Sequence, residues 1–476
     1  MVGISSYEVY VPYYRLDRAV VRKAWGLPPS LPGQKAIANY DEDPLTMAAE
    51  AVSACLAGSE NVRIDALNFA STHYPFTEKQ GAAAIACISD FPEEIAATDF
   101  THSMRAGASA LRAALDAVGS GSAQNVMVSA ADCRTADPGS DLELAMGDGA
   151  VSLLVSDTNP IAEHIGSFSV SHDFSDFQRS EGEISFHRMD DLRFVNTYGY
   201  KQNVSKCIGG ILQKYNLKPG DISRLICPSI EPRVFISTAR KKGFDPGTQL
   251  QDPFFDKIGH LGTAHPLVML AAALDEAEAG DKILMVAYGD GAEAFIFEVT
   301  PEINKVRDRG RLTETIVGGV SFTNYPAYLS TRKTLEQEDR SLSPYTSPAL
   351  KKREEKQNVR RYGCKCTECG LVQFPVRRVC AECGTKDRME DYRIAGTGEI
   401  FTYTREYYIP FPPMNPPMAM VVVDMDGGGR LHIQMTDHEF DEVKIGTKVR
   451  LTYRRLFEGG NVINYFWKCT PVRRWR

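Results

Sequence analysis

The sequence has no long hydrophobic run: no apolar stretch approaches the roughly 18–20 residues that a membrane-spanning helix needs. Its first residues have neither the basic start nor the apolar stretch of a signal peptide. An excess of positive charge is also missing, since the 476 residues carry a net charge of −7. These absences argue against a membrane protein and against nucleic acid as the main partner. We therefore expect a cytoplasmic protein.

Cysteine is sparse along most of the chain and concentrated in one short segment. Five of the eleven cysteines fall between Cys364 and Cys383. The other six stand alone, at Cys55, Cys87, Cys133, Cys207, Cys227 and Cys469. Scattered cysteines in a long chain without a signal peptide are typical of reduced core residues, so we expect no disulfide framework.

The concentrated cysteines form two Cys-x-x-Cys pairs, Cys366 with Cys369 and Cys380 with Cys383, and glycine follows each pair. A two-residue spacer lets both thiolates of a pair point at one ion, and four sulfurs complete a closed tetrahedral site. We expect one structural zinc ion per chain, with rubredoxin-like iron as the alternative. Such a site has no open position for substrate, so its role is to fold the segment. Cys364 is not needed as a ligand and should be free.

Helix-like and strand-like segments alternate over the first 300 residues. The spacing predicts a helix at 109–118 followed by a buried strand at 125–131. A second pair consists of a helix at 267–278 and a strand at 282–287. Each pair is followed by Gly-Asp-Gly-Ala and an apolar strand, at 147–150 and at 289–292. A duplicated, layered α/β fold explains this repeat, although four residues can also recur by chance in a glycine-rich chain.

Composition divides the chain into five expected parts. Residues 1–165 and 166–302 are the two halves of the α/β fold, and 303–360 form a charged connector with helical pieces. Residues 361–390 are the zinc ribbon. Residues 391–476 contain about five short strands with turn signals between them, which is typical of a small OB-fold barrel.

A zinc ribbon next to an OB barrel also occurs in proteins that bind nucleic acid. Here the aromatic residues of the barrel have few basic residues among them, and the proline-rich segment 410–417 is apolar. Contact with another protein is therefore the better interpretation, and nucleic acid remains the less favoured one.

Several different short motifs are spread along the first 300 residues. They include Arg105-Ala-Gly-Ala-Ser-Ala-Leu111, Asp176-Phe-Gln-Arg-Ser-Glu-Gly182, Gly259-His-Leu-Gly-Thr-Ala264 and Tyr288-Gly-Asp-Gly-Ala292. In these motifs the chain resembles hydroxymethylglutaryl-CoA synthase of the archaeal and bacterial kind, in the thiolase superfamily. From about residue 330 it resembles the zinc-ribbon/OB module that is fused to, or assembled with, thiolases. The resemblance implies a five-layered fold, a homodimer, and a tunnel for the pantetheine arm of an acyl-CoA.

The same resemblance implies three catalytic groups: a cysteine that holds the acyl group, a glutamate and a histidine. When the motifs are aligned without gaps, the cysteine position falls on Met104, the glutamate position on Thr72 and the histidine position on Pro228. An asparagine that the family has in its last active-site loop corresponds to His260. Methionine cannot act as a nucleophile or an acid. The resemblance therefore implies a chain without catalytic residues of the family type, a pseudoenzyme.

The pocket candidates are Ser103, Met104, His73, His260 and His265. A shifted register would give Ser103 the nucleophile position, but a hydroxyl bonded to the backbone is the simpler interpretation. His260 and His265 flank a loop that should enter the pocket. Each is more simply a hydrogen-bonding group than a base, and His260 is the best candidate for residual catalysis.

Three functions follow as hypotheses. In the first, the chain binds an acyl-CoA and is the auxiliary subunit of a separate thiolase, held by the zinc/OB module, which makes or cleaves a C–C bond next to a CoA thioester. In the second, it is an enzyme with a replaced, non-covalent mechanism, an aldol or retro-aldol reaction on an acyl-CoA. In the third, it is a scaffold or nucleic-acid-binding protein without acyl-CoA.

Overall fold

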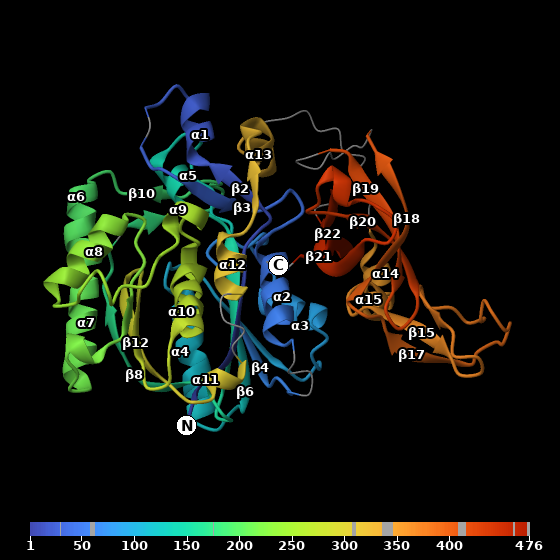
Figure 1. Ribbon diagram of the computed structural model, residues 1–476, viewed down its shortest axis with the longest axis horizontal. Coiled ribbons are helices and arrows are strands. Elements are labelled where there is room, and N and C mark those ends of the chain that lie inside the picture. The colour runs from blue at the N-terminus through green and yellow to red at the C-terminus, as the bar shows by residue number, and fades with distance from the viewer. Residues whose placement is uncertain are drawn as a thin grey trace.

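The computed structural model describes residues 1–28, 30–57, 62–174, 176–306, 311–335, 346–407, 416–459 and 462–473. Among these residues, no helix is both long enough and apolar enough to cross a lipid bilayer. The described chain forms a large layered α/β body, a small three-stranded sheet and a closed barrel (Figure 1).

One nine-stranded sheet runs through the α/β body in the order β11-β12-β13-β8-β1-β7-β6-β4-β5. The first half supplies β1 (Gly3–Tyr10), β4 (Ala66–Ala70), β5 (Ala96–Phe100), β6 (Asn125–Asp132) and β7 (Gly149–Ser156). The second half supplies β8 (Ala162–Ser171), β11 (Arg224–Ile226), β12 (Lys282–Tyr288) and β13 (Gly291–Val299). The halves join where β1 pairs with β8, at Gly3 with Glu163 and Ile4 with Ala162.

Helices complete a five-layered arrangement (Figure 1). The central layer contains α4 (Ala106–Gly119) and α10 (His265–Glu276). The outer layers contain α7 (Gln202–Lys214) and α8 (Pro232–Lys241) on the second half, and α2 (Pro44–Cys55) and α3 (Gly81–Ile88) on the first. Every residue of α10 from His265 to Asp275 is buried. A helix that is apolar nearly all round belongs in such a central layer.

The internal repeat of the sequence marks equivalent places in the two halves. One Gly-Asp-Gly-Ala segment leads into β7 and the other into β13. In each half a central helix precedes a strand that pairs antiparallel with the next, β6 with β7 and β12 with β13. The duplicated α/β fold is therefore confirmed, and the predicted helices and strands lie within a few residues of α4, β6, α10 and β12.

Shorter elements fill the connections. A three-stranded sheet, β14-β2-β3, combines β2 (Tyr14–Asp17), β3 (Gln34–Ile37) and β14 (Val320–Phe322). The other short elements include α1 (Arg18–Ala24), α5 (Asp141–Ala145), β9 (Phe177–Gln178), β10 (His187–Arg188), α6 (Leu192–Phe194), the π-helical segment η1 (Val195–Lys201), α9 (Phe255–Ile258) and the 3-10 segment η3 (Gly262–Ala264).

The segment expected to be a charged connector is partly buried. It contains α11 (Ile303–Val306), α12 (Arg311–Val317), α13 (Tyr325–Thr331), α14 (Pro348–Arg353) and α15 (Glu355–Asn358), besides β14. Leu312 and Ile316 lie in the core of the α/β body, and Arg332 pairs with the buried Asp148. The first part of this segment therefore packs on the α/β body through Leu312 and Ile316, while Val317 of the same helix is exposed. Residues 336–345 lie outside the described residues.

The C-terminal third begins with a three-stranded sheet, β16-β15-β17, made of β15 (Tyr362–Cys366), β16 (Val372–Gln373) and β17 (Met389–Arg393). Five strands then close a barrel in the order β18-β19-β20-β22-β21. They are β18 (Thr397–Glu406), β19 (Met418–Met425), β20 (Arg430–Met435), β21 (Lys448–Gly459) and β22 (Val462–Pro471). A closed five-stranded barrel of this size matches the predicted OB fold.

The barrel docks on the first half of its own chain. Apolar residues of α2 and of β21 and β22 belong to one continuous core, which includes Met47, Tyr453 and Trp467. The hydroxyl of Tyr465 donates a hydrogen bond to Asp43 at 2.7 Å. Figure 1 shows the barrel beside α2, with the small sheet β15/β17 projecting beyond it.

Candidate functional site

A cavity opens where the carboxyl ends of β4 and β6 meet the start of α4 and the loop between β12 and β13. Because β4 and β6 are parallel neighbours, the residues that follow them lie close together. The cavity has a volume of about 120 Å³ and adjoins a smaller one of about 20 Å³. Met104, Asp176, Phe177 and Tyr288 line both cavities, so the two lie side by side between the halves and together form the candidate pocket.

The structure brings together the three positions that the resemblance assigns to catalytic groups. Thr72 and Met104 line the larger cavity, and Met104 and Pro228 line the smaller one. His260 lines the smaller cavity, whereas His73 and Ser103 line the larger. His265 lines neither, because it is buried at the start of α10 beneath His260. Their assignment to the family's chemistry stays a prediction.

Asp132, at the end of β6, fixes the pocket wall. Its carboxylate accepts hydrogen bonds from the hydroxyl of Ser71 and from three backbone amides, those of Thr72, His73 and Thr263. It also accepts one from the hydroxyl of Thr72, at 2.9 Å. Burial raises the pKa of Asp132. Gly262 has a φ of +58°, and a Cβ there would lie 2.1 Å from Asp132 Oδ2, so only glycine fits beside this carboxylate.

Two of the predicted histidines stack on each other, with ring centroids of His260 and His265 4.5 Å apart. The Nδ1 atom of His260 accepts from the amide of Gly262 at 3.2 Å, and that of His265 accepts from the amide of Leu261 at 3.1 Å. Burial lowers the pKa of His265 to about 3 and that of His260 well below its usual value. Both rings are therefore neutral near pH 7 and brace the loop.

The remaining predicted groups sit at the pocket edge. The hydroxyl of Ser103 donates to a carboxylate oxygen of Asp290 at 2.7 Å. Burial, and secondarily Arg179, lowers the pKa of His73 to about 3, so this ring is a poor base at neutral pH. Gly289 packs tightly here, because a Cβ on it would lie 2.8 Å from the amide of Arg105.

Several polar residues of the pocket were not identified from the sequence. Arg188 donates to Asp176 at 2.7 Å, to Glu231 at 2.8 Å and to Asn196 at 3.0 Å. The hydroxyl of Tyr288 donates to the other oxygen of Asp176 at 3.0 Å. Arg134, two residues beyond β6, lies against Thr72 and Met104. A charged residue just after a buried strand was the available signal, and it is a weak one.

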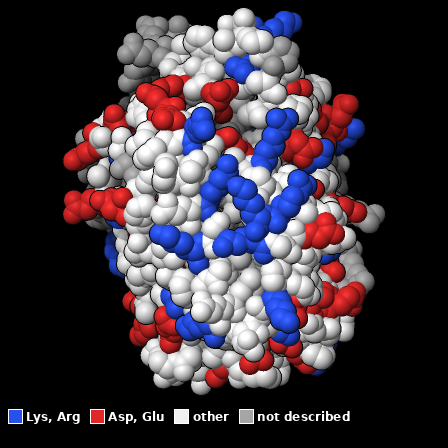
Figure 2. Space-filling view, turned by 90° about the vertical axis from the view of Figure 1, so that its left-hand side faces the viewer, with Lys and Arg blue, Asp and Glu red and all other residues white. Residues whose placement is uncertain are grey.

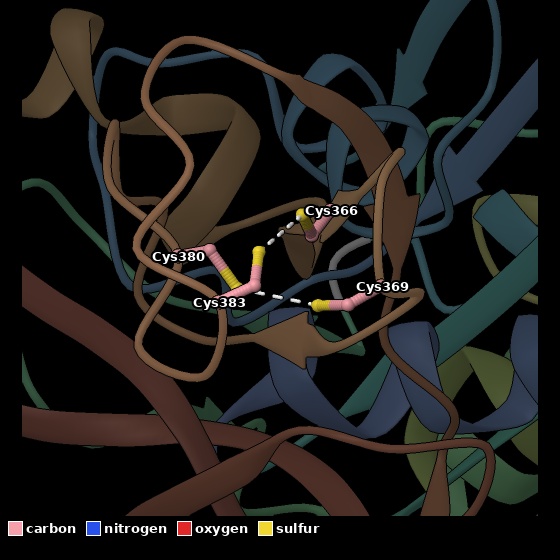
Figure 3. A group of neighbouring side chains, drawn as sticks. All are labelled: Cys366, Cys369, Cys380 and Cys383. Carbon is pink, nitrogen blue, oxygen red and sulfur yellow. Dashed lines mark hydrogen bonds between the residues drawn. The ribbon is translucent and has the colours of Figure 1, made fainter.

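The four cysteines of the two pairs come together in the small sheet. Their sulfur atoms all lie within 4.8 Å of one another and point at a common centre (Figure 3). Sγ–Sγ distances are 3.7 Å for Cys366 with Cys383 and 3.5 Å for Cys369 with Cys380. Four sulfurs around zinc, each about 2.3 Å from the ion, would be about 3.8 Å apart. The donor set therefore fits a tetrahedral metal site. Cys364 lies outside the cluster, and its sulfur accepts the amide of Arg377 at 3.3 Å.

Two family profiles match parts of the chain. Residues 391–454 match the C-terminal OB-fold domain of ChsH2. Residues 212–298 match the C-terminal part of 3-oxoacyl-[acyl-carrier-protein] synthase III. The first match covers β18, β19, β20 and the first part of β21 in the barrel, and the second covers the end of α7 together with α8, α10, β12 and most of β13.

Relatives and solved structures agree with these matches. Hydroxymethylglutaryl-CoA synthase of Methanopyrus kandleri is 28% identical over 345 residues, which cover 70% of this chain and 98% of that protein. The synthase of Methanocaldococcus jannaschii is 28% identical over 346 residues, covering 71% of this chain and all of that protein. A structure of HMG-CoA synthase complexed with CoA matches with a TM-score of 0.63 at 18% identity, covering 73% of this chain and 95% of that one.

The fold of the first 300 residues is therefore thiolase-like. More particularly, the chain resembles hydroxymethylglutaryl-CoA synthase over almost the full length of that enzyme, and it continues into an OB-fold domain similar to that of ChsH2. The resemblance stated from the sequence motifs is confirmed.

Proposed function

We propose that this chain binds an acyl-CoA without forming an acyl-enzyme, and that it is the auxiliary subunit of a thiolase-type complex. The complex makes or cleaves a C–C bond next to a CoA thioester, and a separate thiolase subunit supplies the nucleophile. The observation that carries this proposal is Met104, a side chain without nucleophilic chemistry, at the centre of the pocket.

The other pocket groups support a non-covalent role. No cysteine is among the described residues that line either cavity. The hydroxyl of Ser103 is directed to Asp290 rather than to a histidine. Thr72 and Pro228 have no acid or base to offer.

A basic surface next to the pocket supports a CoA ligand. The segments 192–214 and 232–242, which contain α6, η1, α7 and α8, have eight lysines and arginines and no aspartate or glutamate. Figure 2 looks onto this face, where basic side chains gather across the middle and acidic ones lie toward the edges. The loop that leads into α8 lines the smaller cavity at Pro228 and Ile230. Phosphate groups of CoA would bind such a surface while the pantetheine arm enters the pocket.

We propose zinc for the four-cysteine site, because four thiolates in a tetrahedral set suit zinc and iron held by four cysteines is the rarer case. The ion would hold β15 and the turns that follow it, and it would have no catalytic role. We place the protein in the cytoplasm, where thiols remain reduced.

We propose a homodimer through β5. This strand pairs only with β4 among the described residues, and most of its side chains are exposed. An open strand edge is a template for a second copy. The thiolase subunit would then bind on the outer side of the barrel, where Phe401 is 50% exposed.

Isothermal titration with CoA and acetyl-CoA tests the ligand, both with and without proteins that co-purify from the native host. We expect binding in both cases, and weakening by about three- to tenfold for Arg240→Gln on α8. Arg63→Gln, an exposed arginine of the first half, is the control and should bind as the unchanged protein does. If none of these ligands gives a heat of binding or raises the unfolding temperature, CoA binding is refuted.

The alternative is an enzyme with an aldol or retro-aldol mechanism, and one observation favours it. Two hydroxyl–carboxylate pairs, Tyr288 with Asp176 and Ser103 with Asp290, line the cavity and can donate and accept protons. A 3-hydroxyacyl-CoA incubated with the purified chain distinguishes the two functions. Cleavage by the chain alone, lost in Tyr288→Phe, favours the alternative, whereas cleavage or condensation that needs the co-purified thiolase favours the auxiliary subunit.

A further inference from the structure

A row of aromatic rings leads from the larger cavity to the protein surface. Phe174 lines the cavity, and its ring stacks on that of Phe194 in α6, with the centroids 5.9 Å apart and the planes at 20°. The ring of Phe194 lies 4.9 Å from that of Tyr198 in η1. Phe194 is 44% exposed and Tyr198 is 51% exposed. These three residues, the aromatic row, form a continuous apolar path from the pocket to solvent.

The same segment exposes further large apolar side chains. Ile184, Met189 and Leu192 are exposed as well, so five such side chains fall between positions 184 and 198. Single exposed apolar residues are normal, whereas a concentration of them marks a surface that binds something. The π-helical turn η1, which carries Tyr198, is of a kind that is rare and found mostly at functional sites. Because the row begins inside the cavity, we interpret it as part of the ligand site rather than as a separate protein interface.

The charges around the row indicate which end of a ligand it would hold. Residues 181–194 contain four carboxylates and only two arginines, and one of the carboxylates, Asp191, accepts a hydrogen bond from the amide of Phe194 at 2.9 Å. Carboxylates repel the phosphates of CoA, and equally those of an anionic lipid. The basic surface of α7 and α8, in contrast, has no acidic residue. The aromatic row therefore suits an apolar, uncharged part of the ligand.

The size of the larger cavity limits what can lie inside it. Its volume is about 120 Å³, and a cavity of about 150 Å³ holds one benzene molecule. Only a few carbon atoms beyond a thioester would therefore fit. Three aromatic residues, Phe174, Phe177 and Phe186, line the cavity, and Phe174 is the one that continues outward through the row. A longer acyl chain would leave the cavity over Phe174.

We propose that the aromatic row binds the distal part of a long apolar acyl chain, so that the preferred ligand is an acyl-CoA of about eight carbons or more. This inference rests on the proposed function, since it assumes that an acyl-CoA enters the pocket with its phosphates on α7 and α8. The thioester then lies beside Met104, which lines both cavities, and the first carbons fill the larger one. The remaining methylene groups lie on Phe194 and Tyr198, where contact with the rings removes them from water.

Titration with butyryl-CoA, octanoyl-CoA and dodecanoyl-CoA, below the concentrations at which they form micelles, tests the inference. Each added methylene group should tighten binding about two- to fourfold, so octanoyl-CoA should bind about 10- to 100-fold more tightly than butyryl-CoA. Phe194→Ser should reduce this gain to less than about threefold, because the chain then loses the middle ring of the row. The matched control is Phe440→Ser, which removes a ring of the barrel that is 52% exposed and should keep the full gain.

A second measurement needs no substitution. Octanoyl-CoA with a photoreactive diazirine at the end of its chain should label residues 189–198, as mapped by mass spectrometry. Equal affinities for the three thioesters, or a label only outside this segment, would overturn the acyl-chain site while CoA binding stands. An equal loss of the gain in Phe194→Ser and Phe440→Ser would also overturn it, because the chain would then adsorb to any exposed ring. If neither CoA nor any thioester binds, the proposed function fails and this inference fails with it.

Discussion

Arg454 of the barrel and Asp41 of the first half form an ion pair in which both side chains are completely buried, with Nη1 and Oδ1 3.3 Å apart. The same guanidinium contacts Asp437 at 2.6 Å and Glu42 at 2.7 Å, and Lys468 contacts Asp41 at 2.8 Å. Two cations thus compensate three carboxylates where water has no access. Each charge in this cluster depends on the others.

Replacing Arg454 with methionine should strongly destabilise the protein. The change removes the guanidinium that pairs with all three buried carboxylates, and breaking a buried pair typically costs about 3–5 kcal/mol. Urea unfolding of the full chain measures the loss. The control is Arg430→Met, which removes the exposed pair with Asp424 and should cost less than about 1 kcal/mol. Similar losses in the free energy of unfolding for both variants would mean that the buried cluster stabilises the fold no more than the exposed pair does.

The metal site can be tested with two cysteines of the same segment, one inside the cluster and one outside it. Elemental analysis of the chain purified without chelators should give about one zinc per chain. Cys380→Ser should lose most of the metal, whereas Cys364→Ser, two positions before Cys366 in β15 but outside the cluster, should keep it. Because the small sheet projects from the barrel, the α/β body should stay folded in both. Retention of full zinc by Cys380→Ser would contradict the assigned ligands.

Covalent acylation should fail. With Met104 at the centre of the pocket, radiolabelled acetyl-CoA or acetoacetyl-CoA should leave no acid-stable label on the chain. A hydroxymethylglutaryl-CoA synthase treated in parallel serves as the positive control. A label that mass spectrometry maps to Ser103, or to any cysteine of the first 300 residues, would restore an acyl-enzyme mechanism.

Acidification should weaken the fold through the buried His265. Its pKa is about 3 in the folded chain and about 6.5 when exposed, so below pH 6.5 the unfolded state binds a proton that the folded state does not. Stability should therefore fall between pH 6.5 and 5, by about 1.4 kcal/mol per pH unit for this one group. His265→Gln should reduce the slope of stability against pH by that amount, whatever effect the substitution has on stability at pH 7. His432→Gln, an exposed residue of the barrel, should leave the slope unchanged, and equal slopes in all three proteins would contradict the assignment.

The features predictable from the sequence were those encoded over short distances or repeated. The spacing of Cys366, Cys369, Cys380 and Cys383 determines a metal site by itself, and the Gly-Asp-Gly-Ala repeat marks the two halves. Arg134 was not predictable, because nothing near it in the sequence shows that it meets Met104 and Thr72. The docking of the barrel could not be predicted either, because Arg454 and Asp41 are more than 400 positions apart in the sequence. In the sequence each is indistinguishable from an ordinary surface charge, and only the folded structure shows the pair.

The core shared by α2 and the barrel gives the C-terminal domain a fixed orientation. Because Met47 and Trp467 belong to the same hydrophobic cluster, the barrel is packed firmly on the α/β body and is not attached by a flexible linker alone. A thiolase held on its outer side would be kept at one set distance and angle from the pocket, without the search that a flexible linker imposes. Any transfer of a thioester between the two proteins would then depend on the geometry of this one chain.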